Sequence, residues 1–280
     1  PQNNVSVVLN NEGGHTGLVL NNDAQMIGNG TNTLTISNNT SLYIRGINNF
    51  PTNFGTINLE ELSLARYDAG LADQTVNSSV IYGSLYLASG TRKNLSGNTT
   101  VRKHLYVYYS TDFRLENYDL TIGGNIYNSD EISGNGSITA TGGTVTLNGT
   151  DVDQYVHNCG TGKYTFYNLN LVSSNPTISS TKYFYNIDAG NEIIVNGNFS
   201  ATNTNGNSTT MLFVDINDNL INGGNNFNLG AYVTLLTSGT NTFQSSMTSF
   251  TGTKTFELNS TVRFDRDRKS TRLNSSHRIR

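Results

Sequence analysis

Two stretches of the chain, Asp119-Leu-Thr-Ile-Gly-Gly-Asn-Ile126 and Glu192-Ile-Ile-Val-Asn-Gly-Asn-Phe199, repeat one pattern that decides the fold. Each reads apolar-x-apolar-x-Gly-Asn-apolar, so Gly124 and Gly197 hold the same position. The alternation is typical of a strand with one buried face, and Gly-Asn is typical of a tight corner. A repeat of strand, corner and strand predicts a chain that stacks similar units on one another.

Looser copies of this pattern occur upstream. Val80, Val101 and Leu120 start copies about twenty residues apart, a period typical of solenoid repeats. Within the copy from Val101, side chains alternate between the two faces of the predicted strand. One face carries Leu105, Val107 and Tyr109, and the other carries His104, Tyr106 and Tyr108. This alternation indicates a half-buried strand.

The fold class that these repeats predict is all-β, as a single right-handed parallel β-helix, or β-solenoid. The apolar runs are short and β-branched, and one turn of such a coil must stack on the next to bury its apolar face. A β-sandwich array stays open as an alternative, because hairpins use the same Asn-Gly corners. The side chains expected to point inward are Val80, Leu105, Val107, Ile122, Val145, Leu147, Phe166, Leu169, Leu171, Val195 and Phe199.

Composition places limits on the class of protein. The chain has 280 residues, of which 13% are charged, and a formal net charge of −3. Its single cysteine, Cys159, excludes an intrachain disulfide. No apolar run approaches the roughly 20 residues of a membrane-spanning helix, so we expect no membrane span. The chain starts at Pro1 without Met, and its last residues read as a non-native tail. We therefore expect residues 1–266 to be a repeat domain truncated at both ends.

The last residues differ in character from the repeats. The run Asp267-Arg-Lys-Ser-Thr-Arg-Leu-Asn-Ser-Ser-His277 lacks strand alternation and reads as a translated sequencing-library adapter. We therefore expect residues 267–280 to be a non-native tail outside the coil. This tail holds five of the 17 Lys and Arg and one of the 20 Asp and Glu, so the remaining 12 and 19 give a net charge of −7. Such an acidic domain is not expected to bind nucleic acid.

The sequence offers few candidates for metal or nucleophile chemistry. Asp215 and Asp218 bring together oxygens suited to calcium, but the run lacks the Gly and the distal Glu of a calcium loop. His157 and Cys159 share one face of a predicted strand, as a nucleophile and its base would, and a structural cysteine is the alternative. We expect no cofactor and no catalytic residue.

An enzyme of similar shape stays open as an alternative function. Enzymatic coils of this kind cleave polysaccharides, and glycoside hydrolysis requires two carboxylates at a fixed separation. The Asn-Thr-Asp, Asp-Asp, His-Gly and Arg-Ile-Lys blocks of pectinolytic β-helix enzymes do not occur in the chain. A polysaccharide lyase or hydrolase is therefore the second reading, behind a protein without catalysis.

Four tyrosines in neighbouring copies predict a contact surface. Tyr82, Tyr86, Tyr106 and Tyr108 are expected to form an outward aromatic strip, with the alternative that half of them pack inside the coil. Tyrosine is favoured in interfaces because its ring loses little conformational entropy on binding. Surface glycans or other cell-surface proteins are the expected partners.

Three segments carry a resemblance to a known kind of protein. Leu120-Thr-Ile-Gly-Gly-Asn-Ile126, Gly143-Thr-Val-Thr-Leu-Asn-Gly149 and Thr165-Phe-Tyr-Asn-Leu-Asn-Leu171 resemble, in this order, the secreted β-strand-repeat or adhesin-like surface proteins of Bacteroidota. The resemblance implies a structural or adhesive repeat protein at the extracellular side or the outer cell surface. It also implies export by type IX secretion through a sorting domain beyond the sequence.

Overall fold

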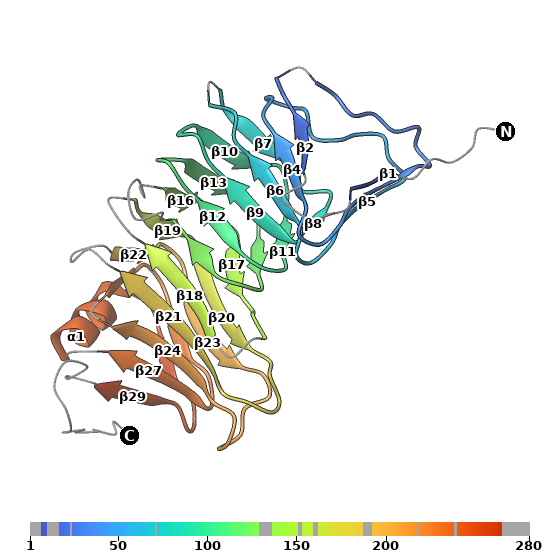
Figure 1. Ribbon diagram of the computed structural model, residues 1–280. Coiled ribbons are helices and arrows are strands. Elements are labelled where there is room, and N and C mark those ends of the chain that lie inside the picture. The colour runs from blue at the N-terminus through green and yellow to red at the C-terminus, as the bar shows by residue number, and fades with distance from the viewer. Residues whose placement is uncertain are drawn as a thin grey trace, which may run out of the picture.

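The fold is a coil of short parallel strands, stacked turn upon turn along one axis (Figure 1). The computed structural model describes residues 7–9, 17–22, 24–70, 72–128, 136–150, 153–158, 162–186, 192–217, 219–237 and 240–264. Every pair of named strands is parallel. The predicted β-solenoid is confirmed and the sandwich alternative is wrong. The right-handed sense of the coil and the non-native tail, which lies outside the described residues, stay predictions.

The longest wall, called here the long sheet, has eleven strands. Its strands, in order, are β2 (Gly17–Leu20), β4 (Ser41–Ile44), β6 (Leu64–Tyr67), β9 (Ser84–Leu87), β12 (Leu105–Val107), β15 (Ile126–Tyr127), β18 (Asp153–Asn158), β21 (Ser180–Asn186), β24 (Leu212–Asn217), β27 (Val233–Thr237) and β29 (Thr261–Phe264). Along β4, β6, β9 and β12, buried and partly exposed side chains alternate, so the sheet has an inner and an outer face. In β24 and β27, near the C-terminal end, three successive residues are buried.

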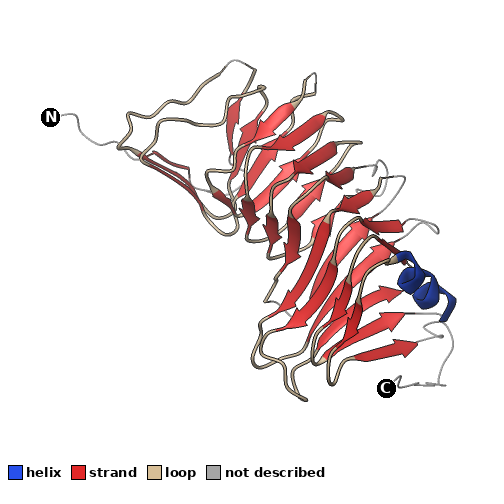
Figure 2. Ribbon diagram, turned by 180° about the vertical axis from the view of Figure 1, so that it is seen from behind, coloured by secondary structure: helices blue, strands red, loops and turns tan. Residues whose placement is uncertain are grey.

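Two further walls close the coil. The middle sheet has eight strands: β8 (Ile81–Tyr82), β11 (Thr99–Val101), β14 (Leu120–Ile122), β17 (Thr144–Leu147), β20 (Asn168–Ser173), β23 (Phe199–Asn203), β26 (Phe227–Leu229) and β28 (Lys254–Phe256). The capped sheet has seven: β7 (Gln74–Val76), β10 (Arg92–Leu95), β13 (Asp112–Glu116), β16 (Ser137–Ala140), β19 (Tyr164–Phe166), β22 (Glu192–Val195) and β25 (Leu220–Gly223). A smaller sheet near the N-terminus joins β1 (Val7–Leu9), β3 (Thr33–Ile36) and β5 (Thr56–Leu59). Seen from behind, the strands are joined by loops and turns, and α1 is the helix drawn beside them (Figure 2).

The core consists of columns of apolar side chains that run along the coil axis. Leu120 pairs in register with Val145, Val145 with Leu169, and Leu169 with Phe199. Phe199 then stacks on Phe227, with ring centroids 5.0 Å apart and planes within 10°. All of the side chains predicted to point inward are buried. Each turn therefore depends on its two neighbours for a closed core, as the repeat predicted.

Buried polar side chains complete the corners of the coil. Gln74 Nε2 donates to the carbonyl oxygens of Ile44 and Gly46 at 2.8 and 2.7 Å, and Gln74 Oε1 accepts from the Ala69 N–H. On the next turn Lys93 takes the place of Gln74, and its Nζ donates to the carbonyl oxygen of Ala69 at 3.1 Å. These bonds supply partners to corner carbonyls that would otherwise be buried without one.

The same pairing of glutamine and lysine occurs a second time. Gln154 and Lys182 are register partners in the long sheet, and both are buried. Gln154 Nε2 donates to the carbonyl oxygens of Ile122 and Gly124, while Lys182 Nζ donates to Gln154 Oε1 at 2.6 Å. An amide on one turn and an ammonium on the next is therefore a recurrent way of satisfying a corner.

One helix interrupts the strand pattern. α1 (Thr240–Ser249) follows β27 and precedes β28, the position that a strand of the capped sheet would hold. Ser246 Oγ accepts a hydrogen bond from the Ile221 N–H at 3.2 Å, and Ser249 Oγ accepts one from the Gly223 N–H at 2.8 Å. The helix therefore covers the edge of β25 and partners its backbone (Figure 1). Among the described helices, none is long and apolar enough to cross a membrane.

Candidate functional site

A column of ring-bearing and cationic side chains lies on the outer face of the long sheet. Strand register places Tyr43, Arg66, Tyr86, Tyr106, Tyr127 and His157 directly above one another on six successive turns. We call these six residues the aromatic ladder. Each of the six residues alternates with buried neighbours along its strand. Because successive side chains of a strand point to opposite faces, all six side chains point away from the core.

Neighbouring members of the aromatic ladder are in contact along its length. The Arg66 guanidinium lies 4.5 Å from the ring centroid of Tyr86, a cation–π distance. Tyr86 and Tyr106 have centroids 5.7 Å apart, and Tyr106 and Tyr127 stack at 5.2 Å with planes 14° apart. Tyr127 in turn stacks on His157 at 5.1 Å. The spacing follows from the roughly 4.8 Å between strands.

Further rings widen the aromatic ladder at its centre. Tyr108 meets the ring of Tyr86 edge-on at 5.1 Å, and His104 lies 5.6 Å from the ring of Tyr127. Beside the end of the aromatic ladder, Tyr155 stacks on Tyr183 at 4.9 Å. The outer face of the long sheet thus carries a band of rings two side chains wide in places.

The aromatic ladder is nearly uncharged at neutral pH, and partial burial extends this neutral state to higher pH for its phenols and to lower pH for its imidazole. Desolvation raises the pKa of the Tyr86 and Tyr106 hydroxyls, and it lowers the pKa of the His157 imidazole. At neutral pH the phenols are protonated, as ordinary phenols are, and the imidazole of His157 is neutral. The aromatic ladder offers hydroxyl groups that donate and accept hydrogen bonds, with Arg66 as its one permanent charge.

The prediction for Tyr86, Tyr106 and Tyr108 places them correctly on one outer surface, but the prediction for Tyr82 is wrong. Tyr82 is 0% exposed and lies in the middle sheet, where its hydroxyl forms a 2.9 Å hydrogen bond with that of Tyr67. A corner at Gly83 separates β8 from β9, so Tyr82 and Tyr86 lie in different walls. The period of two within one strand therefore does not relate their faces.

Tyr109 also differs from its predicted position. The alternation placed Tyr109 on the same face as Leu105 and Val107, but β12 ends at Val107. Tyr109 has a φ of 54° and is an exposed residue. A turn in the left-handed region breaks the period of two that a strand would continue.

Sequence reasoning missed Tyr43, Arg66, Tyr127 and His157 as members of one column. The signal for Tyr127 was in the repeat, because Tyr127 follows Ile126 as Tyr106 follows Leu105. The other three lie in turns of different length, and only strand register aligns them.

Of the two weak metal candidates, the structure describes only Asp215. Asp215 is buried in β24, and its Oδ1 accepts a hydrogen bond from the Asn217 N–H at 3.0 Å. Asp218 lies outside the described residues, as does Cys159, the proposed neighbour of His157. Within the described part of the chain, no group of three or more His, Cys, Asp or Glu side chains is placed to hold a metal ion.

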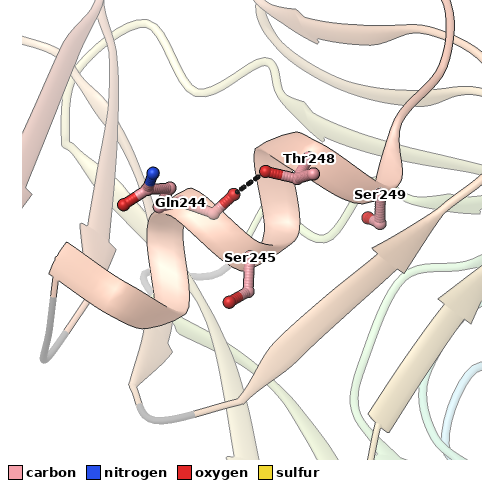
Figure 3. A pocket seen from close by; sticks show the side chains of 4 residues that line it. All are labelled: Gln244, Ser245, Thr248 and Ser249. Carbon is pink, nitrogen blue, oxygen red and sulfur yellow. Dashed lines mark hydrogen bonds between the residues drawn. The ribbon is translucent and has the colours of Figure 1, made fainter.

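A glycoside hydrolase would need two carboxylates in one groove, and three surface hollows can be compared with this requirement. A hollow of about 530 Å³ on α1 is lined by Gln244, Ser245, Thr248 and Ser249, without a carboxylate (Figure 3). A hollow of about 940 Å³ between α1 and the last turn contains Glu257, and one of about 600 Å³ near the N-terminal turns contains Asp68. None of these three hollows brings together the two carboxylates that glycoside hydrolysis requires.

Comparison of the chain with protein-family models, with curated proteins and with solved structures found no significant match.

Proposed function

We propose that this chain is a structural or adhesive repeat protein of the extracellular side or outer cell surface, without catalytic activity, and that its aromatic ladder binds glycans. The observation that carries the proposal is the unbroken column of Tyr43, Arg66, Tyr86, Tyr106, Tyr127 and His157 on one outer face. The resemblance to secreted β-strand-repeat proteins of Bacteroidota supports the location and the adhesive role.

The chemistry of the aromatic ladder suits a polymer of sugar rings. Hydroxyls repeated at roughly the strand spacing of 4.8 Å match a ligand that itself repeats hydroxyls along its length. Contacts between neighbouring rings, such as Tyr106 on Tyr127, hold the side chains in place before a ligand arrives. Binding therefore costs little additional side-chain entropy, and many weak contacts add along the chain of the ligand.

The test is the double variant Tyr86→Ala and Tyr106→Ala. We expect it to lower the affinity for immobilised surface polysaccharide by at least about tenfold, or roughly 1.4 kcal/mol. The matched control is Tyr118→Ala with Tyr167→Ala, because both of these tyrosines are exposed and lie away from the aromatic ladder. Far-ultraviolet circular dichroism should be the same for both variants and the parent.

Two results would contradict the proposal. Equal loss of affinity in both double variants would mean that the aromatic ladder is not the binding surface. Turnover of any polysaccharide by the purified chain would contradict the absence of catalysis and favour the lyase or hydrolase.

A further inference from the structure

The hollow of about 600 Å³ opens where β2, β4 and β6 end. Its polar lining is dense in amides and includes one arginine and one carboxylate. The polar side chains that line it are those of Asn22, Gln25, Arg45, Asn48, Asn49 and Asp68. Planar amides and guanidinium groups are suited to the hydroxyl and anionic groups of a saccharide.

This hollow adjoins the aromatic ladder. Tyr43 and Arg45 lie two residues apart and both are turned away from the core, since Leu42 and Ile44 are buried. The Arg45 guanidinium lies 5.6 Å from the ring centroid of Tyr43. A ligand on the aromatic ladder would therefore reach Arg45 without leaving the outer face of the long sheet.

The charges around the hollow are not balanced. The carboxylate of Asp68, whose side chain is 7% exposed, is paired at 2.9 Å with Arg66 Nε. Arg45 Nε lies 3.6 Å from the other oxygen, Asp68 Oδ1, which is too long for a hydrogen bond and leaves that buried oxygen without a hydrogen-bond partner. The single negative charge of Asp68 is therefore shared by two cations, Arg66 and Arg45.

A third cation adds to this excess. The buried ammonium of Lys93 donates a hydrogen bond to the carbonyl oxygen of Ala69, the residue after Asp68. The negative charge of Asp68 attracts this ammonium electrostatically. Asp73, which also acts on Lys93, is paired with Arg92. Arg45, Arg66 and Lys93 against Asp68 give this corner a charge of +2 in a chain whose formal net charge is −3.

We propose that the hollow binds an acidic sugar unit, carrying a carboxylate or a sulfate, in the glycan that the aromatic ladder holds. This inference rests on the proposed function and adds the ligand class. Arg45 would take the anionic group, because its guanidinium is held between Tyr43 and Asp68 with its side chain 45% exposed. The exposed amides of Asn22, Gln25 and Asn48 would take the neighbouring hydroxyls. The buried amide of Asn49 instead bonds the backbone of the surrounding corner.

The experiment compares Arg45→Gln with Arg92→Gln by isothermal titration calorimetry. Arg92 is the matched control, because its side chain is 43% exposed, is ion-paired with Asp73 and lies outside the lining of the hollow. The probes are hexagalacturonate, its neutral methyl ester, and a sulfated galactose hexamer with its unsulfated parent. Far-ultraviolet circular dichroism confirms that each variant is folded.

We expect the parent protein to bind at least one acidic probe at least tenfold more tightly than its neutral counterpart, and Arg45→Gln to remove that preference. Arg92→Gln should retain it, and added salt should weaken it. The stronger acidic probe distinguishes a carboxylate from a sulfate ligand. Equal binding of acidic and neutral probes by the parent would overturn this inference and leave the glycan proposal intact. Failure to bind any probe would overturn this inference, while the tyrosine variants test the proposed function separately.

Discussion

Residues of the same type have opposite roles in this coil, depending on which side of a corner they lie. Tyr82 and Tyr86 are four positions apart, yet Tyr82 donates a hydrogen bond to the carbonyl oxygen of Asn77 inside the coil, while Tyr86 contacts Arg66 outside it. The alternation within each strand could be predicted from the sequence, because it needs only a period of two. The faces of two strands on either side of a corner could not be related, because the angle of the corner is not encoded in that period.

Lys93 shows how far a charged residue can depart from the usual preference for the surface. Its side chain is buried, and its ammonium donates to the Thr91 hydroxyl at 2.6 Å as well as to Ala69. Sequence reasoning had no signal for this, because lysine is rarely buried unless it is paired. The tertiary partner, a corner carbonyl on the preceding turn, exists only once the turns have stacked.

Lys93 makes the stability of the protein depend on pH in a defined window. Burial lowers the pKa of its ammonium from the ordinary 10.5 to about 8. Between these values the unfolded chain keeps a proton that the folded chain has lost, so this group makes the free energy of unfolding rise with pH from about 8. Above about pH 10, the raised pKa values of buried Tyr67 and Tyr82 act in the opposite direction.

The measurement is urea unfolding of the parent and of Lys93→Met at pH 7, 8, 9 and 9.5. We expect the free energy of unfolding of the parent, relative to that of the variant, to increase from pH 8 to pH 9.5. Parallel pH profiles for the two proteins would show that Lys93 is not the group responsible. Taking the difference cancels the titration of all other groups that the substitution leaves unaffected.

At the scale of elements, α1 is a helix that its own sequence does not favour. The segment Thr240–Ser249 is rich in Thr, Ser and Asn, which have modest helix propensity, and it has no acidic residue in its first turn. Tertiary contacts explain it, because Phe243 and Met247 lie on one side of the helix and pack against the core. The serines on α1 then provide the hydrogen-bonding groups that a missing strand would have supplied.

This role predicts a specific cost for removing two hydroxyls. In the double variant Ser246→Ala and Ser249→Ala, the N–H groups of Ile221 and Gly223 lose their acceptors. We expect a loss of about 1–3 kcal/mol in the free energy of unfolding for the buried N–H of Ile221, and a smaller loss for the half-buried N–H of Gly223, which water can reach. Hydrogen exchange at these two amides should accelerate at the same time.

Thr248→Ala is the control on the same helix. The Thr248 hydroxyl donates to the carbonyl oxygen of Gln244 within α1 and is exposed (Figure 3). Its removal should change the free energy of unfolding by less than about 0.5 kcal/mol. If Thr248→Ala destabilises the protein as much as the double serine variant does, then the serines act by stabilising α1 itself, and their hydrogen bonds to β25 are not the cause.

At the scale of the whole molecule, the coil is a stack in which each turn contacts its neighbours. Register pairs join Thr99 to Leu120 in the middle sheet and Leu105 to Ile126 in the long sheet, so residues 99–119 span one complete turn. Such stacks gain stability from repeated turns and the interfaces between them. Deleting one whole turn should therefore leave the remaining strands in the same order and register.

We expect a variant lacking residues 99–119 to fold. In this variant Ile126 would pair with Leu85, because each of these residues pairs with Leu105 in the parent protein. Circular dichroism should retain a strand spectrum, and urea unfolding should stay cooperative. The shorter deletion of residues 99–110 removes β11 and β12 but keeps β13, so it breaks the order of the walls and should unfold the neighbouring turns. Greater stability of the shorter deletion would contradict the assignment of the turn.

The helix α1 closes the last edge of the capped sheet. Strand edges are templates for fibre formation, and a coil whose walls all end in bare edges would accept another coil end to end. Here β28 and β29 are the last strands of two walls, whereas β25 in the third is covered by α1. Another strand could pair with β25 only by displacing α1. In polymer terms, α1 is a terminator for one wall only: the capped sheet stops at β25, while each of the other two walls adds one more strand, β28 and β29.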